Sequence, residues 1–227
     1  MKRLIVFSGA GMSAESGIPT FRGSDGLWEN HRLEDVATPE AWERDPALVL
    51  EFYNQRRKAI LEAQPNEGHQ LIARWQDEFD VTVITQNIDD LHERAGSTDV
   101  LHLHGEIRKS RSTANSQLVY PIENWHLHIG DMCENGTQLR PHIVWFGEDV
   151  PMLEIAANKI SVADIFLVVG TSLQVYPAAG LVHYALQATQ RFIVDPQANE
   201  LLKMDDWRSI SMGASEGLRL ADSELLR

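Results

Sequence analysis

The feature that most constrains the fold is a short apolar run at residues 4–7 that leads directly into the small-residue loop Ser8-Gly9-Ala10-Gly11. Four consecutive apolar, β-prone residues are typical of a strand buried on both faces. A glycine loop directly after such a strand is typical of the turn that holds a dinucleotide diphosphate at a helix N-terminus, because glycines let the backbone approach a phosphate. The loop lacks the full G-x-G-x-x-G spacing, so taken alone it is equally consistent with a plain tight turn.

Further apolar runs recur along the chain, and each one ends in a glycine or a polar patch. They occupy residues 81–85, 143–146, 165–169 and 192–194. Segments with helical patterns lie between them, at residues 46–63, 67–79, 153–162 and 178–189. This alternation predicts an α/β fold with a Rossmann-like, doubly wound parallel sheet, whose ligands gather at the carboxyl ends of the strands.

Two stretches interrupt the alternation, a largely helical one at residues 23–65 and a polar, irregular one at residues 106–140. We expect both to form a smaller cap module inserted into one domain that spans residues 1–227. The large, Rossmann-like part then comprises approximately residues 1–22, 66–105 and 141–227.

Composition narrows the choice of partners and compartment. The chain of 227 residues has 33 acidic and 20 basic side chains and a formal net charge of -13, which argues against nucleic acid or an anionic membrane as the partner. The single cysteine, Cys133, excludes an internal disulfide framework and fits a reducing compartment. No apolar run approaches the roughly 20 residues of a membrane span, so we expect a soluble, cytoplasmic protein. The oligomeric state is left open.

Six motifs, taken together, resemble the sirtuin family. They lie at residues 9–22, 85–89, 104–106, 140–148, 170–177 and 213–217. The similarity spans nearly the whole chain, in order, and is greatest to the compact bacterial protein-lysine deacylases. It implies that the protein uses NAD to remove an acyl group from lysine on protein substrates, releasing nicotinamide and O-acyl-ADP-ribose.

The resemblance assigns catalytic roles to His104, Asn87 and Asp89. Asn87 and Asp89 follow a predicted strand and suit hydrogen bonding to a carboxamide, although the same segment also fits a helix N-cap. Histidine suits a general base that deprotonates a ribose hydroxyl, because its ordinary pKa of about 6.5 lies near working pH. His102 lies on the same apparent strand, but only His104 precedes the Gly-Glu of the family motif.

The cofactor site implied by the resemblance is larger and comes from several loops. Its residues are Gly9, Ala10, Gly11, Met12, Ser13, Glu15, Thr20, Phe21, Arg22, Trp28, Gln86, Asn87, Ile88, Asp89, His104, Gly170, Thr171, Ser172, Asp195 and Ala214. Phe21 is expected to shield the ribose from water and Arg22 to reach a phosphate. Thr20 stands where many family members carry Asp. Asp195 is placed to bind a ribose hydroxyl of the adenosine, which disfavours NADP.

The substrate pocket is expected to include Tyr53 and Arg56, which lie at i and i+3 and so project from the same helix face. A phenol beside a guanidinium makes a receptor for a carboxylate. Sirtuins that prefer succinyl- or malonyl-lysine carry this pair, so the resemblance implies desuccinylase or demalonylase activity alongside deacetylase activity. The alternative is a solvated basic helix face. The other expected substrate-binding residues are Val144, Phe146 and Gly147.

The chain departs from the family in its expected metal site. Typical sirtuins bind a structural zinc through two C-x-x-C pairs, which fall here on Ser112 and Asn115 and on Met132 and Asn135, all poor zinc ligands. A replacement set is conceivable from His126, His128, Asp131 and Cys133. We expect no bound metal, and a module held by apolar residues that include Leu118, Tyr120, Trp125, Leu127 and Leu139.

Two alternatives to a deacylase stay open at this point. A mono-ADP-ribosyltransferase or NAD hydrolase would use the same cleft with a different acceptor. A catalytically silent NAD-binding sensor would fit the missing zinc ligands, but it would have no need of a base beside the ribose.

Overall fold

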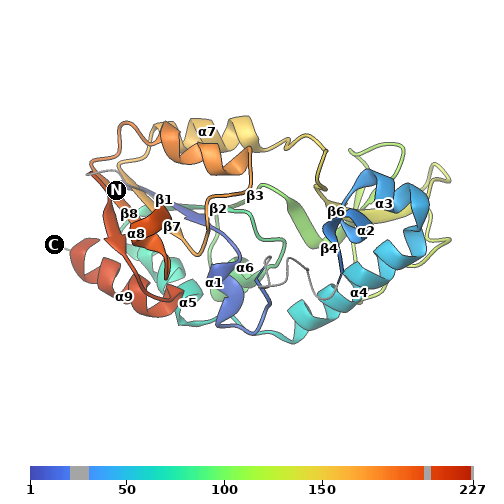
Figure 1. The fold of residues 1–227 in the computed structure, drawn as a ribbon, viewed down its shortest axis with the longest axis horizontal. Helices are drawn as coiled ribbons and strands as arrows, with labels where there is room; N and C mark the ends of the chain where they lie inside the picture. The colour runs from blue at the N-terminus through green and yellow to red at the C-terminus, as the bar shows by residue number, and fades with distance from the viewer. Residues whose placement is uncertain (21–30, 202–205, 226–227) are drawn as a thin grey trace.

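The structure is a computed structural model that describes residues 1–20, 31–201 and 206–225. It contains a six-stranded parallel sheet and, at the end of the molecule opposite the chain termini, a smaller three-stranded antiparallel sheet (Figure 1). None of the helices in the described ranges combines the length and apolar character that crossing a membrane requires.

The large sheet has the strand order β3-β2-β1-β7-β8-β9. Its strands are β1 (Arg3–Ser8), β2 (Asp80–Thr85), β3 (Val100–His102), β7 (Ile165–Val169), β8 (Gln190–Val194) and β9 (Arg208–Ile210). The chain runs outward from β1 to β3, returns to the other side of β1 at β7, and then runs outward to β9. The predicted doubly wound α/β fold is therefore confirmed, and its direction reverses between β1 and β7, where such sheets bind ligands.

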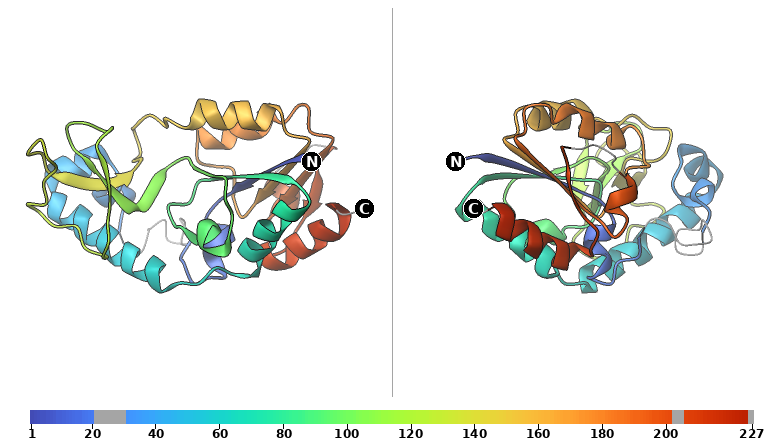
Figure 2. Two further views of the ribbon diagram at one scale, coloured as in Figure 1. Left: turned by 180° about the vertical axis from the view of Figure 1, so that it is seen from behind. Right: turned by 60° about the vertical axis from the view of Figure 1, so that its left-hand side comes forward.

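Helices cover both faces of this sheet (Figure 2). One face packs against α5 (Glu67–Arg74), the 3-10 turn η1 (Trp75–Asp77) and α9 (Ala214–Leu225), and the other against α7 (Leu153–Ser161), the 3-10 helix η2 (Ala178–Tyr184) and α8 (Ala198–Leu201). Side chains of β1 alternate between the two cores: Leu4 and Val6 enter the first, Ile5 and Phe7 the second. This double burial explains the continuous apolar runs.

The small module combines three strands with three helices. Its elements are α2 (Leu33–Val36), α3 (Pro39–Arg44), α4 (Pro46–Glu62), β4 (Gly105–Ser112), β5 (Val119–Pro121) and β6 (Leu139–Ile143). Asp45 starts α4, because its carboxylate accepts a hydrogen bond from the Leu48 amide and Pro46 occupies the first turn. The short helices α1 (Gly11–Ala14) and α6 (Leu91–Ala95) follow β1 and β2.

Two predictions of secondary structure are wrong. Residues 143–146 do not form a strand of the parallel sheet: β6 ends at Ile143 and pairs antiparallel with β4. The run is apolar because Ile143 and Trp145 enter the core of the small module, while Val144 and Phe146 line a cleft. The expected helix at 178–189 is the shorter η2. The division into a large and a small part stays a prediction, and β6 crosses its expected boundary between residues 140 and 141.

Candidate functional site

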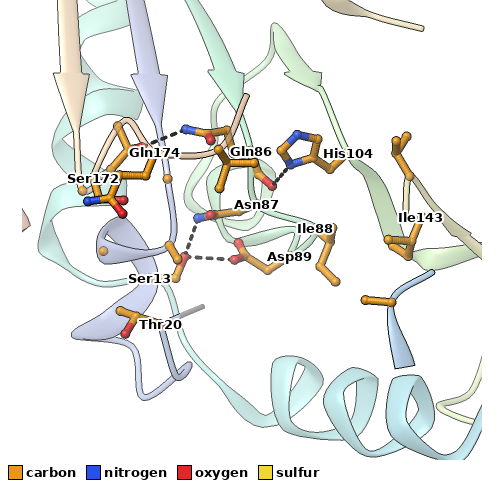
Figure 3. A pocket seen from close by; sticks show the side chains of 18 of the residues that line it. Ser13, Thr20, Gln86, Asn87, Ile88, Asp89, His104, Ile143, Ser172 and Gln174 are labelled. Carbon is orange, nitrogen blue, oxygen red and sulfur yellow. Dashed lines mark hydrogen bonds between the residues drawn. The ribbon is translucent and has the colours of Figure 1, made fainter. Parts of the chain in front are cut away.

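A cleft of about 520 Å³ opens at the carboxyl ends of β1, β2, β7 and β8 and extends to the small module (Figure 3). Most of the predicted site residues line it together: Gly9, Ala10, Gly11, Ser13, Thr20, Tyr53, Arg56, Gln86, Asn87, Ile88, Asp89, His104, Val144, Phe146, Gly147, Gly170, Thr171, Ser172 and Asp195. The structure thus brings residues from seven separate stretches of sequence into one cavity, whose size is typical of small-molecule sites.

The glycine loop after β1 packs directly against the loop after β7. The Gly9 amide donates to the Val169 carbonyl at 3.0 Å, and the Gly11 amide donates to the Gly170 carbonyl at 2.8 Å. A Cβ added to Gly11 would lie 2.8 Å from the Gly170 Cα, and one added to Gly170, which has φ +62°, would lie 2.2 Å from the Met12 nitrogen. These glycines are therefore required by contact between two loops at the switch point, a reason that the single-loop motif did not indicate.

Three polar side chains of the predicted cofactor site, Ser13, Asn87 and Asp89, form one hydrogen-bonded cluster (Figure 3). Ser13 Oγ donates to Asp89 Oδ2 at 2.9 Å and accepts from Asn87 Nδ2 at 3.1 Å. The other Asp89 oxygen accepts from the Leu91 amide at 3.2 Å, so the carboxylate also closes the turn into α6. Burial raises the pKa of Asp89, although its bonds to Leu91 and Ser13 act the other way. The local-turn interpretation and the ligand-binding interpretation of this segment are thus compatible.

The orientation of His104 suits a base. Its Nδ1 lies 3.0 Å from the Gln86 carbonyl oxygen, which can only accept, so Nδ1 carries the proton and Nε2 keeps its lone pair. Burial lowers the pKa of His104, partly offset by this hydrogen bond, so the ring is neutral at pH 7. His104 lies just after β3, where the chain enters the small module, and it borders the cleft.

Tyr53 and Arg56 lie on α4 and both line the cleft. Their exposed fractions are 1% and 5%, so the alternative of a solvated basic helix face is wrong. The Tyr53 hydroxyl accepts a hydrogen bond from Trp145 Nε1 at 3.1 Å. Burial raises the pKa of Tyr53 well above its ordinary value, with the Arg56 charge opposing, so the hydroxyl stays protonated.

The loop that carries Val144, Phe146 and Gly147 is held by Glu148, a residue that the sequence analysis missed. Its carboxylate accepts from both Nη atoms of Arg140, at 2.8 and 2.9 Å, and from Arg111 Nη2 at 3.1 Å. Burial alone would raise the pKa of Glu148, but these two arginines lower it below its ordinary value. Both Arg140 and Glu148 lie inside the motif at 140–148, so their spacing was a usable signal.

Asp195 lines the cleft beyond β8 and is half-buried, which raises its pKa. Its Oδ1 accepts from the Gln197 amide at 2.9 Å, so one oxygen closes the local turn. A role in binding an adenosine ribose stays a prediction.

Other predicted cofactor residues lie behind the cleft or outside the described residues. Met12 is buried in the core beneath the glycine loop, and Glu15 accepts a hydrogen bond from the Ser215 amide at the start of α9, next to buried Ala214. None of these three lines the cleft, so direct contact with a cofactor is not supported for them. Phe21, Arg22 and Trp28 fall outside the described residues.

The positions expected to replace the zinc cysteines make local hydrogen bonds. Ser112 Oγ accepts from the amides of Ala114 and Asn115, both at 3.1 Å, and lies 2.6 Å from Thr137 Oγ1, which in turn lies 3.1 Å from Cys133 Sγ. Met132 is 54% exposed. Within the described ranges no three His, Cys, Asp or Glu side chains are grouped to hold a metal, so His126, His128, Asp131 and Cys133 do not assemble.

Two polar side chains of α4 fasten the irregular segment of the small module. Arg57 is fully buried and donates to the carbonyls of Ile107 at 2.6 Å and Trp125 at 2.8 Å, and to Asn54 Oδ1 at 2.8 Å. Asn54 also exchanges hydrogen bonds with the backbone of Leu127, at 2.9 and 3.0 Å. Of the expected apolar residues, Leu127 is buried in a small cluster against which Leu139 packs, whereas Leu118, Tyr120 and Trp125 are only partly buried and belong to no core cluster. A buried polar link therefore supplements a smaller apolar core than predicted.

Comparison with known proteins shows the family to which this chain belongs. The model of the Sir2 family matches residues 9–177. A protein from Bacteroides thetaiotaomicron named NAD-dependent protein deacylase is 51% identical over 223 residues, which cover 96% of this chain and 95% of that protein. A protein of the same name from Aggregatibacter actinomycetemcomitans is 53% identical over 86% of this chain and 93% of its own length.

Solved structures agree. A crystal structure of a Sir2 homolog–NAD complex superposes with a TM-score of 0.85 at 39% identity, covering 99% of this chain and 91% of that one. A structure described as Sir2–p53 peptide–NAD+ gives a TM-score of 0.79 at 28% identity, covering 99% of this chain and 94% of that one. The chain belongs to the Sir2 family, as its motifs predicted.

Proposed function

We propose that this protein is an NAD-dependent protein-lysine deacylase that accepts acyl groups with a distal carboxylate, such as succinyl and malonyl, as well as acetyl. The deacylase activity agrees with the names of relatives at about half identity over nearly the full chain. The observation that carries it is the shared cleft, in which a neutral His104 and the Ser13–Asn87–Asp89 cluster border the same cavity. The same names favour deacylation over ADP-ribosyl transfer, NAD hydrolysis or silent binding.

The donor and acceptor set of the cleft fits NAD. The amide of Asn87 and the carboxylate of Asp89 complement a carboxamide, which both donates and accepts hydrogen bonds. When bound, NAD supplies a glycosidic bond to nicotinamide whose cleavage exposes an electrophilic ribose carbon. Asn87 and Asp89 hold the leaving carboxamide, and their cluster with Ser13 fixes both side chains in advance, so little reorganisation is needed.

His104 provides the base. Its Nε2 lone pair is available at neutral pH because Nδ1 is committed to the Gln86 carbonyl and burial lowers the pKa of the ring. A neutral imidazole at this position would remove the proton from a ribose hydroxyl. The acyl oxygen of the substrate would bond to the ribose carbon that nicotinamide leaves, and the deprotonated hydroxyl would attack the acyl carbon. Water would then replace the lysine amine, which leaves with the proton held by His104, so that the acyl group ends on the ribose.

The acyl preference rests on Tyr53 and Arg56. A buried guanidinium in a cleft attracts a carboxylate more strongly than an exposed one, because water screens it less. The Tyr53 hydroxyl, kept protonated, supplies a neutral partner beside it. Val144, Phe146 and Gly147 lie on the neighbouring loop that Glu148 holds, and there they border the path of an acylated lysine.

Matched acetyl- and succinyl-lysine peptides test this assignment with Arg56→Met, which removes the charge and keeps most of the apolar bulk. Loss of a charge-assisted contact costs about 2–4 kcal/mol, or about 30- to 1000-fold in kcat/KM towards succinyl-lysine, while the acetyl rate changes only a fewfold. Tyr53→Phe is expected to act in the same direction more weakly. Equal losses on both substrates would refute the carboxylate preference and leave the deacylase activity intact.

The compartment is part of the proposal. We place the enzyme in the cytoplasm, where its single cysteine fits a reducing environment and acylated proteins are available as substrates.

A further inference from the structure

His102 makes two short hydrogen bonds just behind the cleft. It ends β3, and its side chain is 8% exposed. Its Nδ1 lies 3.0 Å from the backbone carbonyl oxygen of Asn87, and its Nε2 lies 2.7 Å from Glu93 Oε1 on α6. It does not line the cleft, so it contacts no bound ligand directly.

Both partners of His102 are acceptors, so both ring nitrogens must carry a proton, and the ring is an imidazolium. Burial opposes this charge, but the hydrogen bond and charge of Glu93 outweigh it and raise the pKa of His102. The other titratable groups that interact electrostatically with His102 are Glu106 on β4, Asp89 on the loop after β2 and His92 on α6. Lys109 on β4 acts on the Glu93 carboxylate in turn.

His102 is connected through the backbone to the loop that carries Asn87 and Asp89. His104 binds the Gln86 carbonyl, and His102 binds the next carbonyl along the chain, that of Asn87. Two consecutive peptide groups of the loop after β2 are therefore hydrogen-bonded to histidines at the end of β3 and just after it. The side chains of Asn87 and Asp89 project from that loop into the cluster with Ser13.

We propose that His102, kept as a cation by Glu93, is a positioning residue that fixes the Asn87 peptide and so sets the geometry with which Asn87 and Asp89 hold nicotinamide. This inference rests on the proposed function. A partner that orients a ligand-binding residue from behind affects the ligand that this residue touches and leaves distant subsites unchanged.

Glu93→Gln tests the inference, because it removes the carboxylate from a partly exposed side chain without emptying a core position. We expect the inhibition constant of the product nicotinamide to rise about tenfold, while KM for the acyl-lysine peptide stays unchanged. When the His102 ring loses one proton, the other stays on Nε2, which faces the Glu93 carboxylate, so the Nδ1 hydrogen bond to the Asn87 carbonyl is lost as pH rises through the pKa of His102. Glu93→Gln lowers that pKa, and the alkaline limb of kcat/KM for NAD should therefore move to lower pH.

The matched control is Glu78→Gln, which removes an exposed carboxylate remote from the site and should change none of these quantities. His102→Leu should reproduce the nicotinamide effect, and Glu93→Gln added to it should have no further effect. An unchanged nicotinamide constant and pH profile in Glu93→Gln would overturn the proposal, as would equal weakening of nicotinamide and peptide together with a lower Tm. A wild-type protein that releases no nicotinamide would refute the proposed function instead.

Discussion

Replacing Arg57 with methionine should destabilise the protein markedly, whereas the same change at its neighbour Arg56 should not. Both arginines lie on α4 and both are buried, but they face different surroundings. Arg57 donates hydrogen bonds to Ile107, Asn54 and Trp125, and so joins the helix to β4 and to the irregular segment after β5. Arg56 instead lines the cleft, so this pair of variants separates module stability from substrate recognition.

The size of the effect follows from two opposing contributions. Three hydrogen bonds from a charged donor contribute roughly 1.5–3 kcal/mol each, or about 4.5–9 kcal/mol together. Burial, reinforced by the Arg108 charge, lowers the pKa of Arg57 from its ordinary value to about 10. That lowering of the pKa means that the site disfavours the charged guanidinium by about 3 kcal/mol. The full penalty applies at neutral pH, which lies below the pKa of Arg57 in both the folded and the unfolded protein. The net loss in Arg57→Met is therefore about 2–6 kcal/mol.

Thermal and urea unfolding of the wild type and the two variants measures this difference. For a chain of this length, each kcal/mol lowers Tm by about 2–4 °C, so Arg57→Met should lose at least about 4 °C. Hydrogen exchange should accelerate first in β4 and β5, because the lost bonds anchor that region. If Arg57→Met unfolds at the wild-type temperature, or Arg56→Met is equally destabilised, the buried polar link does not stabilise the module.

Three further outcomes are expected. His104→Ala should lower kcat by at least ~10²-fold with NAD affinity nearly unchanged, and near-normal turnover of the variant would exclude this base. In the wild type, the rate should fall on the acid side only below pH 6.5, because burial lowers the pKa of His104 and protonation removes the base. Purified protein should contain far less than one equivalent of zinc and keep its activity and Tm in a strong chelator, whereas stoichiometric zinc that is lost in Cys133→Ser would show a real metal site. Gly170→Ala should weaken NAD binding about tenfold and destabilise the protein more than Gly136→Ala does. Both glycines have positive φ, but only at Gly170 would an added Cβ lie against the Met12 nitrogen, so equal effects of the two variants would show that φ alone matters.

Local sequence patterns predicted the four central strands β1, β2, β7 and β8, because these strands are buried on both faces and read as continuous apolar runs. The edge strands β3 and β9 are only partly buried and were not among the predicted runs. The same reasoning failed at residues 143–146, where burial against α4 and exposure to the cleft also produce an apolar run. A one-dimensional pattern records that a residue is buried but not which element covers it. The pairing of β6 with β4 depends on a contact between distant segments, which the pattern does not contain.

The functional site was likewise only partly predictable from the sequence. His104, Asn87 and Asp89 were found because family motifs name them, and the structure brings them to one cleft. Ser13 was predicted only as a cofactor residue, and Glu93 was not predicted at all, because their hydrogen bonds to Asp89 and His102 join segments that are distant in sequence. Charge and residue type along the sequence indicate candidate chemistry, whereas tautomers, pKa directions and hydrogen-bond partners arise only from packing.

We expect the protein to transfer an acyl group from lysine to the ADP-ribose portion of NAD. Incubating it with NAD and a succinyl-lysine peptide, and quantifying all products by mass spectrometry, measures this transfer. Nicotinamide, unmodified peptide and O-succinyl-ADP-ribose should form in equal amounts. Nicotinamide with free ADP-ribose or ADP-ribosylated protein and an intact acyl peptide, or no nicotinamide at all, would contradict this expectation.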